Sequence, residues 1–203
     1  MTSSEDRRDC LFCNVAPTRA GTTPWHDTPL ATEPGVGGVI AGLGAFVPGY
    51  VLIFPDLHVT SIAQMPSRPF DSFGRFATRV AKAITHEYGP VTVFEHGSCP
   101  TMGIRRSACI THAHLHMIPG SYQLSSHLAA TRATTGAVSR KAGYLFLREP
   151  HGKARYYTDP GVSQLFRRLI AKKLDIADQW DWLMFPEKEN VAATIERLRS
   201  RLQ

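Results

Sequence analysis

The sequence lacks the features that mark membrane proteins, secreted proteins and simple nucleic-acid binders. No apolar run in its 203 residues reaches the roughly 20 residues that a membrane-spanning helix needs. Residues 1–9 are polar and hold no apolar segment of a signal peptide, so we expect a disordered tail there and a cytoplasmic protein. No run of about five Lys or Arg occurs, so we expect neither a nucleic-acid nor a membrane partner.

Internal repeats and low-complexity tracts are also absent. Because 43% of the residues are hydrophobic, the chain can bury a core, and its length predicts one domain or one domain with an appendage. The net charge of +6 favours an anionic ligand such as a phosphate. The basic residues are dispersed, with some weight in the C-terminal part, where we interpret them as a solvated helix face.

Cysteine is scarce, with four residues in the chain: Cys10, Cys13, Cys99 and Cys109. Because we find no export signal, we expect no disulfide bonds. The spacing of Cys10 and Cys13 indicates a redox pair or half of a metal site. No strand is expected before Cys10, which disfavours the redox motif. We interpret Cys99 and Cys109 as small buried apolar residues.

The most informative stretch is a run of histidines that alternate with apolar residues between Thr111 and Pro119. Alternation predicts a strand with two different faces. His112, His114 and His116 should therefore share one face, with neighbouring Cα atoms about 6.5 Å apart. Three imidazoles on one face are costly to bury without partners. They can ligate a metal, bind a phosphate, or act as nucleophile and acid.

The remaining patterns predict an α+β protein, because strand-like and helix-like segments both occur along the chain. The first two strands should form an antiparallel hairpin around the turn at 47–49. We expect strands over 39–46, 50–54, 91–94, 143–148 and 155–157, and helices over 71–88, 123–133, 162–174 and 190–202.

The histidine run resembles the His-φ-His-φ-His-φ-φ pattern of the histidine-triad (HIT) superfamily, where φ is apolar. Residues 10–13 (Cys-Leu-Phe-Cys) resemble its opening Cys-x-φ-Cys, and residues 49–58 its Gly-His-φ-Leu-φ-φ-Pro-x-x-His strand. Residues 94–97 (Phe-Glu-His-Gly) match a longer bacterial branch more loosely. The resemblance implies an antiparallel sheet that carries the triad, with a long helix packed on it. It divides the chain into a HIT-like nucleotide-binding core at 10–120 and a strand and helix extension at 121–203.

The resemblance also implies chemistry at the α-phosphorus of a nucleotide. Family members are mostly nucleotidyl hydrolases and transferases that cleave phosphoanhydride, phosphoramidate or related bonds. By resemblance, His114 is the nucleophile that forms a nucleotidyl-histidine, and His116 contacts the phosphate and assists the leaving group as a general acid. Candidates for further substrate contacts are Ser107, Arg105, Arg106 and Glu95, the last at a position where many members have Asn.

A structural zinc site is implied as well. In many bacterial members the Cys-x-x-Cys pair, the His after the Pro-x-x strand end and the first triad His bind zinc. Carried over, the ligands are Cys10, Cys13, His58 and His112, a set that suits tetrahedral zinc. Two alternatives are a metal-free cluster and one metal held by all three triad histidines, although the latter leaves the cysteine pair unexplained.

Some positions depart from the family pattern and leave the substrate open. Tyr50 replaces a frequent His, and 41–44 (Ala-Gly-Leu-Gly) lacks the acidic residue that often contacts ribose. An alternative function is therefore a zinc-stabilised nucleotide-binding module with little catalysis, and another is an enzyme for an unusual nucleotide conjugate. His96 either reaches the site or is satisfied by backbone groups in a turn. A homodimer is a family expectation.

Overall fold

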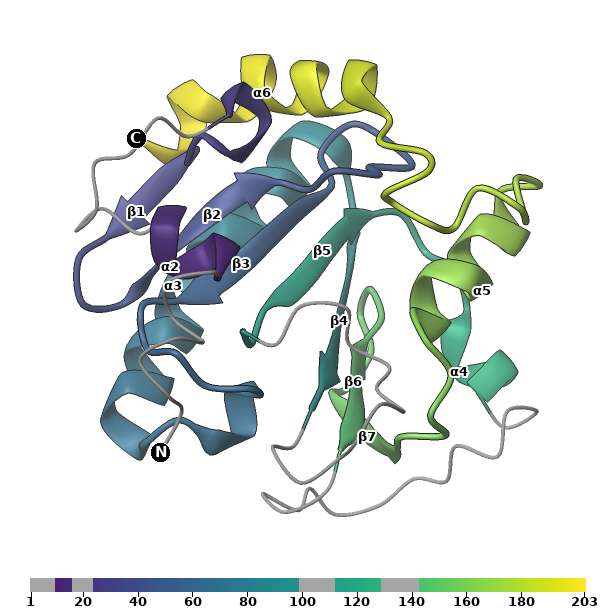
Figure 1. Cartoon of the computed structure of the whole chain (residues 1–203), viewed down its shortest axis with the longest axis horizontal. Helices are drawn as coiled ribbons and strands as arrows, with labels where there is room; N and C mark the ends of the chain where they lie inside the picture. The colour runs from purple at the N-terminus through teal and green to yellow at the C-terminus, as the bar shows by residue number, and fades with distance from the viewer. Residues whose placement is uncertain (1–9, 16–23, 99–111, 129–142) are drawn as a thin grey trace.

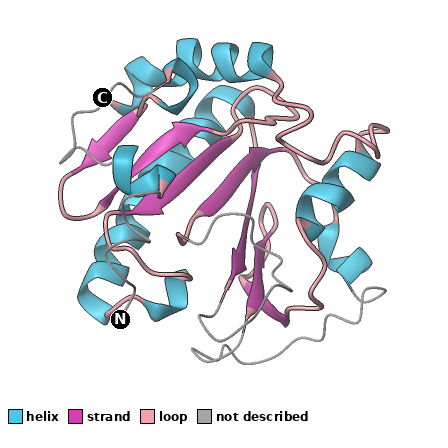
Figure 2. Cartoon of the chain, in the orientation of Figure 1, coloured by secondary structure: helices cyan, strands magenta, loops and turns pink. Residues whose placement is uncertain are grey.

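A computed structural model describes residues 10–15, 24–98, 112–128 and 143–203. These residues form an α+β fold around a single sheet, as the sequence predicts (Figures 1 and 2). The predicted tail at 1–9 and the positions of Cys99 and Cys109 lie outside the described residues. No helix of the described part is both long and apolar enough to cross a bilayer.

The sheet is antiparallel throughout and has seven strands in the order β1-β2-β3-β5-β4-β6-β7. The predicted hairpin is confirmed, since β2 and β3 pair with Ile40 opposite Leu52. The strands are β1 (Ala31–Glu33), β2 (Gly37–Ala41), β3 (Val51–Pro55), β4 (Val91–Gly97), β5 (Leu115–Pro119), β6 (Tyr144–Arg148) and β7 (Arg155–Thr158).

The long helix α3 (Ser67–Tyr88) packs on one face of the sheet. Its apolar residues recur at helical spacing, and Phe73, Val80 and Ile84 are buried in a core cluster with Val39, Ile53 and Met117. Gly89 follows the helix at φ 88°, a conformation that glycine adopts without strain, and its N–H bonds the carbonyl of Thr85. The remaining short segments on the N-terminal side are the 3-10 turns η1 (Trp25–Asp27) and η2 (Ile62–Gln64).

The opposite face carries a second core cluster and is covered by elements from both ends of the chain. The short helix α2 (Leu11–Val15) lies over β3, whereas α4 (Leu124–Leu128) and α5 (Leu165–Lys173) lie beside β4 and β6 (Figure 1). The last helix, α6 (Lys188–Leu202), contacts α3 and β2. We call the face under α2 and α5 the triad face.

The predicted extension continues the same sheet, because β6 pairs with β4 and β7 pairs with β6. Two local predictions that bear on the site are wrong. The strand β5 begins only at Leu115, so His112 and His114 precede the strand that the alternation predicts for them, and β4 continues through Gly97 where we expected the strand to end at Phe94. The second difference decides which face Glu95 occupies, because side chains alternate along a strand.

Candidate functional site

The three histidines of the run lie on the triad face, as the alternation predicts. His116 is on β5, and the rings of His114 and His116 are 4.7 Å apart. Ala113 and Met117 belong to the core cluster under α3. The exposed fractions are 1% for His112 and 8% for both His114 and His116, so these imidazoles sit in a largely dry environment.

His114 is oriented by its own backbone neighbour. Its Nδ1 lies 2.8 Å from the carbonyl oxygen of His112, and because a carbonyl only accepts, Nδ1 carries the hydrogen. Nε2 of the neutral ring therefore has the free lone pair. Burial lowers the pKa of His114 to about 4, although the hydrogen bond to His112 opposes this shift. The ring is therefore unprotonated at neutral pH, which is the form a nucleophile needs.

His116 lies between an aromatic ring and a phenol. It stacks on Phe94 with centroids 4.4 Å apart and 8° between the planes. Its Nδ1 is 2.7 Å from the hydroxyl of Tyr50. Burial is the largest cause that lowers the pKa of His116 well below its ordinary value, and the positive charge of Arg167 acts in the same direction.

Arg167 is a functional candidate that sequence reasoning missed. We expected a solvated face in the C-terminal helices, but this α5 side chain is 3% exposed. Its guanidinium donates to the carbonyl of Gly44 at 2.9 Å, the carbonyl of Trp180 at 2.8 Å and the hydroxyl of Tyr50 at 3.3 Å. It also lies 4.3 Å from the centre of the Phe46 ring. Among the ion pairs of the described residues, none includes Arg167.

The buried guanidinium therefore places a fixed positive charge beside the histidines without a carboxylate partner from the described chain. Neutral carbonyls and a phenol hold it, so the charge is solvated but not cancelled. Such a charge favours an anion at the triad face. The local sequence gives no sign that Arg167 is the buried one, because it is one of several basic residues in α5.

His96 joins the same face from β4. Its ring is 6.0 Å from the His116 ring and 5.0 Å from Phe166, and its Nε2 accepts the backbone N–H of Phe166 at 3.3 Å. We considered that His96 either reaches the site or is satisfied by backbone groups in a turn. It does adjoin the site and it accepts a backbone hydrogen bond, but it lies on a strand and not in a turn. Burial lowers the pKa of His96 to about 3. A third neutral imidazole thus lines this face.

Glu95 does not join the triad. Because β4 continues through Gly97, Glu95 points to the α3 face, opposite its neighbours Phe94 and His96. Its carboxyl accepts hydrogen bonds from Tyr144 Oη at 2.6 Å and from the backbone N–H of Ile62 at 2.8 Å. Burial raises the pKa of Glu95 to about 7. This placement corrects our assignment of Glu95 as a residue near the substrate phosphate.

The other predicted substrate contacts, Ser107, Arg105 and Arg106, lie outside the described residues.

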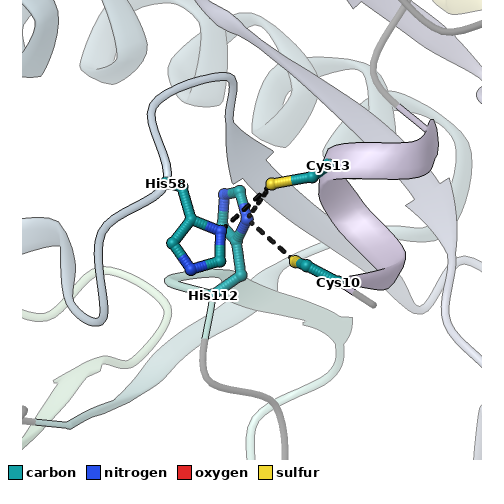
Figure 3. Close-up of side chains that lie close together, drawn as sticks. All are labelled: Cys10, Cys13, His58 and His112. Carbon is teal, nitrogen blue, oxygen red and sulfur yellow. Dashed lines mark hydrogen bonds between the residues drawn. The ribbon is translucent and has the colours of Figure 1, made fainter. Parts of the chain in front are cut away.

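The four predicted zinc ligands are all described, and the structure brings them together (Figure 3). One potential ligand atom from each of Cys10, Cys13, His58 and His112 lies within 4.8 Å of all the others. Cys10 and Cys13 bracket the first turn of α2, His58 follows β3, and His112 precedes β5.

The geometry of this cluster fits a tetrahedral metal. Nδ1 of His58 lies 3.0 Å from Sγ of Cys13, and Nδ1 of His112 lies 3.3 Å and 3.6 Å from the sulfurs of Cys10 and Cys13. Bonds of about 2.3 Å to sulfur and about 2.0 Å to nitrogen require ligand atoms about 3.4–3.8 Å apart. Small displacements therefore admit a zinc ion.

The second nitrogen of His112 supports the same interpretation. Nε2 lies 2.8 Å from the carbonyl oxygen of Pro55, so it carries the hydrogen and leaves the Nδ1 lone pair facing the thiols. Metal-bound histidines characteristically donate their second N–H to a carbonyl or carboxylate. The arrangement also separates the roles of the triad, because the Nδ1 lone pair of His112 faces the cysteines while His114 Nδ1 bonds a carbonyl.

Comparison with solved structures returns histidine-triad proteins. A member of the HIT family from Bacillus subtilis is 19% identical, with 64% of this chain and 99% of that chain covered and a TM-score of 0.44. A zinc-bound histidine-triad family protein from Mycobacterium smegmatis is 18% identical over 56% of this chain and 76% of that chain (TM-score 0.43). A HIT family hydrolase from Clostridium thermocellum is 16% identical over 55% and 90% (TM-score 0.38).

Comparisons with protein-family models and with curated proteins find no match to this sequence. These similarities assign the chain neither a family nor an activity. The roles of individual residues therefore depend on the side-chain geometry described above.

Proposed function

We propose that this protein is a nucleotidyl hydrolase or transferase that acts through a covalent nucleotidyl-histidine at His114. The observation that carries the proposal is the hydrogen bond of 2.8 Å from His114 Nδ1 to the His112 carbonyl, because it leaves the Nε2 lone pair available on a neutral ring. The adjacent ring of His116, 4.7 Å away, supplies an N–H to the phosphate.

The reaction has two displacement steps. In the first, Nε2 of His114 attacks the α-phosphorus of a nucleotide conjugate, a P–N bond forms, and the bond from phosphorus to the leaving group breaks. In the second, water or another acceptor attacks the same phosphorus and releases His114. The buried charge of Arg167 favours the anionic phosphate in both steps.

Zinc has a structural role in this proposal. Cys10, Cys13, His58 and His112 would hold it, with two thiolates and two imidazoles as ligands. Bound there, the ion ties α2 and the segment after β3 to the residue that begins the histidine run. His114 is two residues from that ligand, so the cluster keeps the nucleophile in place without taking part in phosphoryl transfer.

The test is intact-protein mass spectrometry after brief incubation with dinucleoside polyphosphates and nucleoside phosphoramidates. We expect the wild-type protein to gain the mass of one nucleotidyl group. The adduct should persist longer in His116→Ala, because that variant lacks the imidazole next to His114, and it should be absent in His114→Ala. An unchanged cleavage rate in His114→Ala would contradict the proposal. Tight nucleotide binding without adduct or product would instead support the binding module.

A further inference from the structure

A cavity lies beneath α3, on the face of the sheet opposite the triad face. Its volume is about 270 Å³, and α3 and strands β4 to β7 contribute most of its lining. The aromatic side chains of the described lining are Phe70, Phe73, Tyr144, Phe146 and Tyr156. Because a cavity of about 150 Å³ already holds a benzene molecule, this one has room for a ring with a short chain.

Glu95 brings the one carboxyl of the described lining into the wall of this cavity. The side chain is 2% exposed, and its oxygens accept hydrogen bonds from the backbone N–H of Ile62 and the hydroxyl of Tyr144. A carboxylate offers about four lone-pair sites, so two of them stay available. No ion pair among the described residues includes Glu95. The ionised group therefore lacks a counter-charge from the described part of the chain.

Without a cation, a proton neutralises this group, and burial accordingly raises the pKa of Glu95 to about 7. The other titratable side chains of the described lining are Tyr144, Arg148 and Tyr156. Arg148 is exposed and pairs with Val93 in the register, whereas Glu95 pairs with Phe146. Water screens the exposed guanidinium, so its charge does not replace a cation at Glu95.

The lining suits a ligand with one positive charge and an apolar body. The carboxylate would repel an anion, and a neutral molecule would leave the buried charge unpaired. A metal ion needs several protein ligands, whereas the described lining offers one carboxylate and a few hydroxyls. An ammonium group can occupy the two free lone-pair sites of Glu95. Aromatic faces attract it as well, and the rings of Tyr144 and Phe146 lie 5.7 Å and 5.2 Å from that of Tyr156.

We infer that this cavity binds a small apolar amine, with its ammonium group on the carboxylate of Glu95 and its body between the aromatic side chains. The site goes beyond the proposed function, because Glu95 and its neighbour His96 point to opposite faces of the sheet. Binding forms no covalent bond. Where Glu95 is protonated, the ammonium group replaces that proton, and one proton passes to solvent for each amine bound.

The first experiment compares 2-phenylethylamine, 2-phenylethanol and phenylacetate, which share a phenyl ring and a two-carbon chain. Titration calorimetry at pH 8 measures their binding to the full chain, with the amine protonated and Glu95 ionised. We expect the amine to bind at least about tenfold more tightly than the alcohol, because hydrogen bonds between charged groups are the stronger ones. Equal binding of amine and alcohol, tighter binding of phenylacetate, or no binding of the amine at millimolar concentration would overturn the inference.

Glu95→Gln should remove the advantage of the amine over the alcohol. Glu149→Gln is the matched control, because Glu149 also accepts a backbone N–H, from Leu124, and a hydroxyl, from Ser125, but lies outside this cavity. In carbon-13 NMR of glutamate-labelled wild-type protein, saturating amine should move the titration of Glu95 at least about one pH unit lower, the shift that tenfold tighter binding to the ionised form produces. An unchanged titration, or wild-type amine affinity in Glu95→Gln, would overturn the inference.

Ala77→Phe tests the place of the ligand within the cavity. Ala77 is buried on α3 and lines the cavity, so a larger side chain has free volume to enter. We expect it to abolish amine binding with little change in melting temperature. Ala81→Phe, about one turn further along α3, lines a different pocket and should bind the amine normally. Wild-type affinity in Ala77→Phe would place the amine elsewhere and overturn the inference.

The outcomes are separate from those for the proposed function. His114→Ala should bind the amine as the wild type does, although it forms no nucleotidyl adduct. Phe70 lines the same cavity and is 43% exposed, so a second copy of the chain is the competing occupant. A dimer that Phe70→Asp dissociates, together with no binding of the amine, would assign the cavity to an interface between copies and overturn the inference.

Discussion

The ring of Phe12 lies 5.1 Å from the ring of His114, and in the sequence Phe12 stands between Cys10 and Cys13 of the candidate zinc cluster. Its side chain is fully buried, stacks on Phe54 at 4.6 Å and meets the edge of His112 at 5.6 Å. The helix that carries the thiols thus packs directly against the proposed nucleophile. A displacement of Cys10 or Cys13 would therefore move Phe12, and through Phe12 it would move the ring of His114.

Phe12→Leu tests this contact. The substitution keeps most of the apolar volume, so we expect a loss of about 1–2 kcal/mol of unfolding free energy. It removes the ring that packs on His114, so adduct formation should also slow. Phe73→Leu is the matched control, because Phe73 is equally buried but belongs to the α3 side of the sheet. Equal effects of both variants on adduct rate would argue against a specific role of Phe12.

Metal removal should act on stability and activity together. Chelation, or the double change Cys10→Ser with Cys13→Ser, should remove close to one zinc per chain and lower the melting temperature, because metal binding and folding are coupled. Adduct formation at His114 should fall in the same samples. Metal analysis, calorimetry and the mass-spectrometric assay measure the three effects. Wild-type protein that is equally stable and active without metal would contradict a structural zinc.

Gly44→Ala tests how Arg167 is held. A Cβ at Gly44 would lie 2.6 Å from Cβ of Trp182 and 2.7 Å from NH2 of Arg167, at φ +71°. We expect a loss of about 2–4 kcal/mol from backbone strain and crowding together, and weaker anion binding as the guanidinium shifts. Gly35→Ala is the control, since its φ is +75° but nothing lies within 4 Å of the added Cβ.

The two glycine variants share the backbone cost, so their difference in unfolding free energy measures crowding at Arg167. Denaturant titrations give that difference, and titration with inorganic phosphate reports the anion site. If both variants lose the same stability and bind phosphate equally well, Gly44 does not matter to Arg167 beyond its backbone conformation.

The sequence predicts the parts of the site that depend on local spacing. The alternation of histidines with apolar residues is enough to place His114 and His116 on a common face, although only His116 lies on β5. A motif carried over from the HIT resemblance predicts that Cys10 and His58 come together. The sequence does not predict Arg167, because the burial of that side chain depends on carbonyls and rings far away in the chain. The Gly44 carbonyl that it bonds is 123 residues distant. Local patterns hold no information on such contacts.

The error at Glu95 has a different cause. The Glu-His-Gly sequence suggested a turn, in which neighbouring side chains share no fixed side. Because β4 continues to Gly97 and pairs with β6, its side chains alternate between the two faces of the sheet. Glu95 therefore lies on the face opposite to that of His96. We predicted the end of this strand three residues too early, at residue 94 and not at residue 97. That error was enough to place Glu95 on the wrong face.

Glu95 gives a pH-dependent prediction with a definite sign. Its pKa rises from an ordinary value of 4.5 to about 7 in the folded protein, because burial outweighs the hydrogen bonds from Tyr144 and Ile62. Between these two pH values the folded state binds the proton more tightly than the unfolded state, so the contribution of Glu95 to stability falls as pH rises from about 4.5 to about 7. The difference is on the order of 3 kcal/mol.

Glu95→Gln should abolish this dependence, because the amide is neutral at every pH and still accepts from Ile62. Urea unfolding of both proteins between pH 5 and 8 isolates the effect, since the buried histidines contribute equally to each. The stability of the variant relative to the wild type should rise with pH up to about 7 and then stay constant. Tyr144→Phe should have the opposite effect: without the hydroxyl that lowers the Glu95 pKa, the decline should continue to higher pH. Parallel stability curves for wild type and Glu95→Gln would mean that Glu95 is ionised in the folded protein across this range.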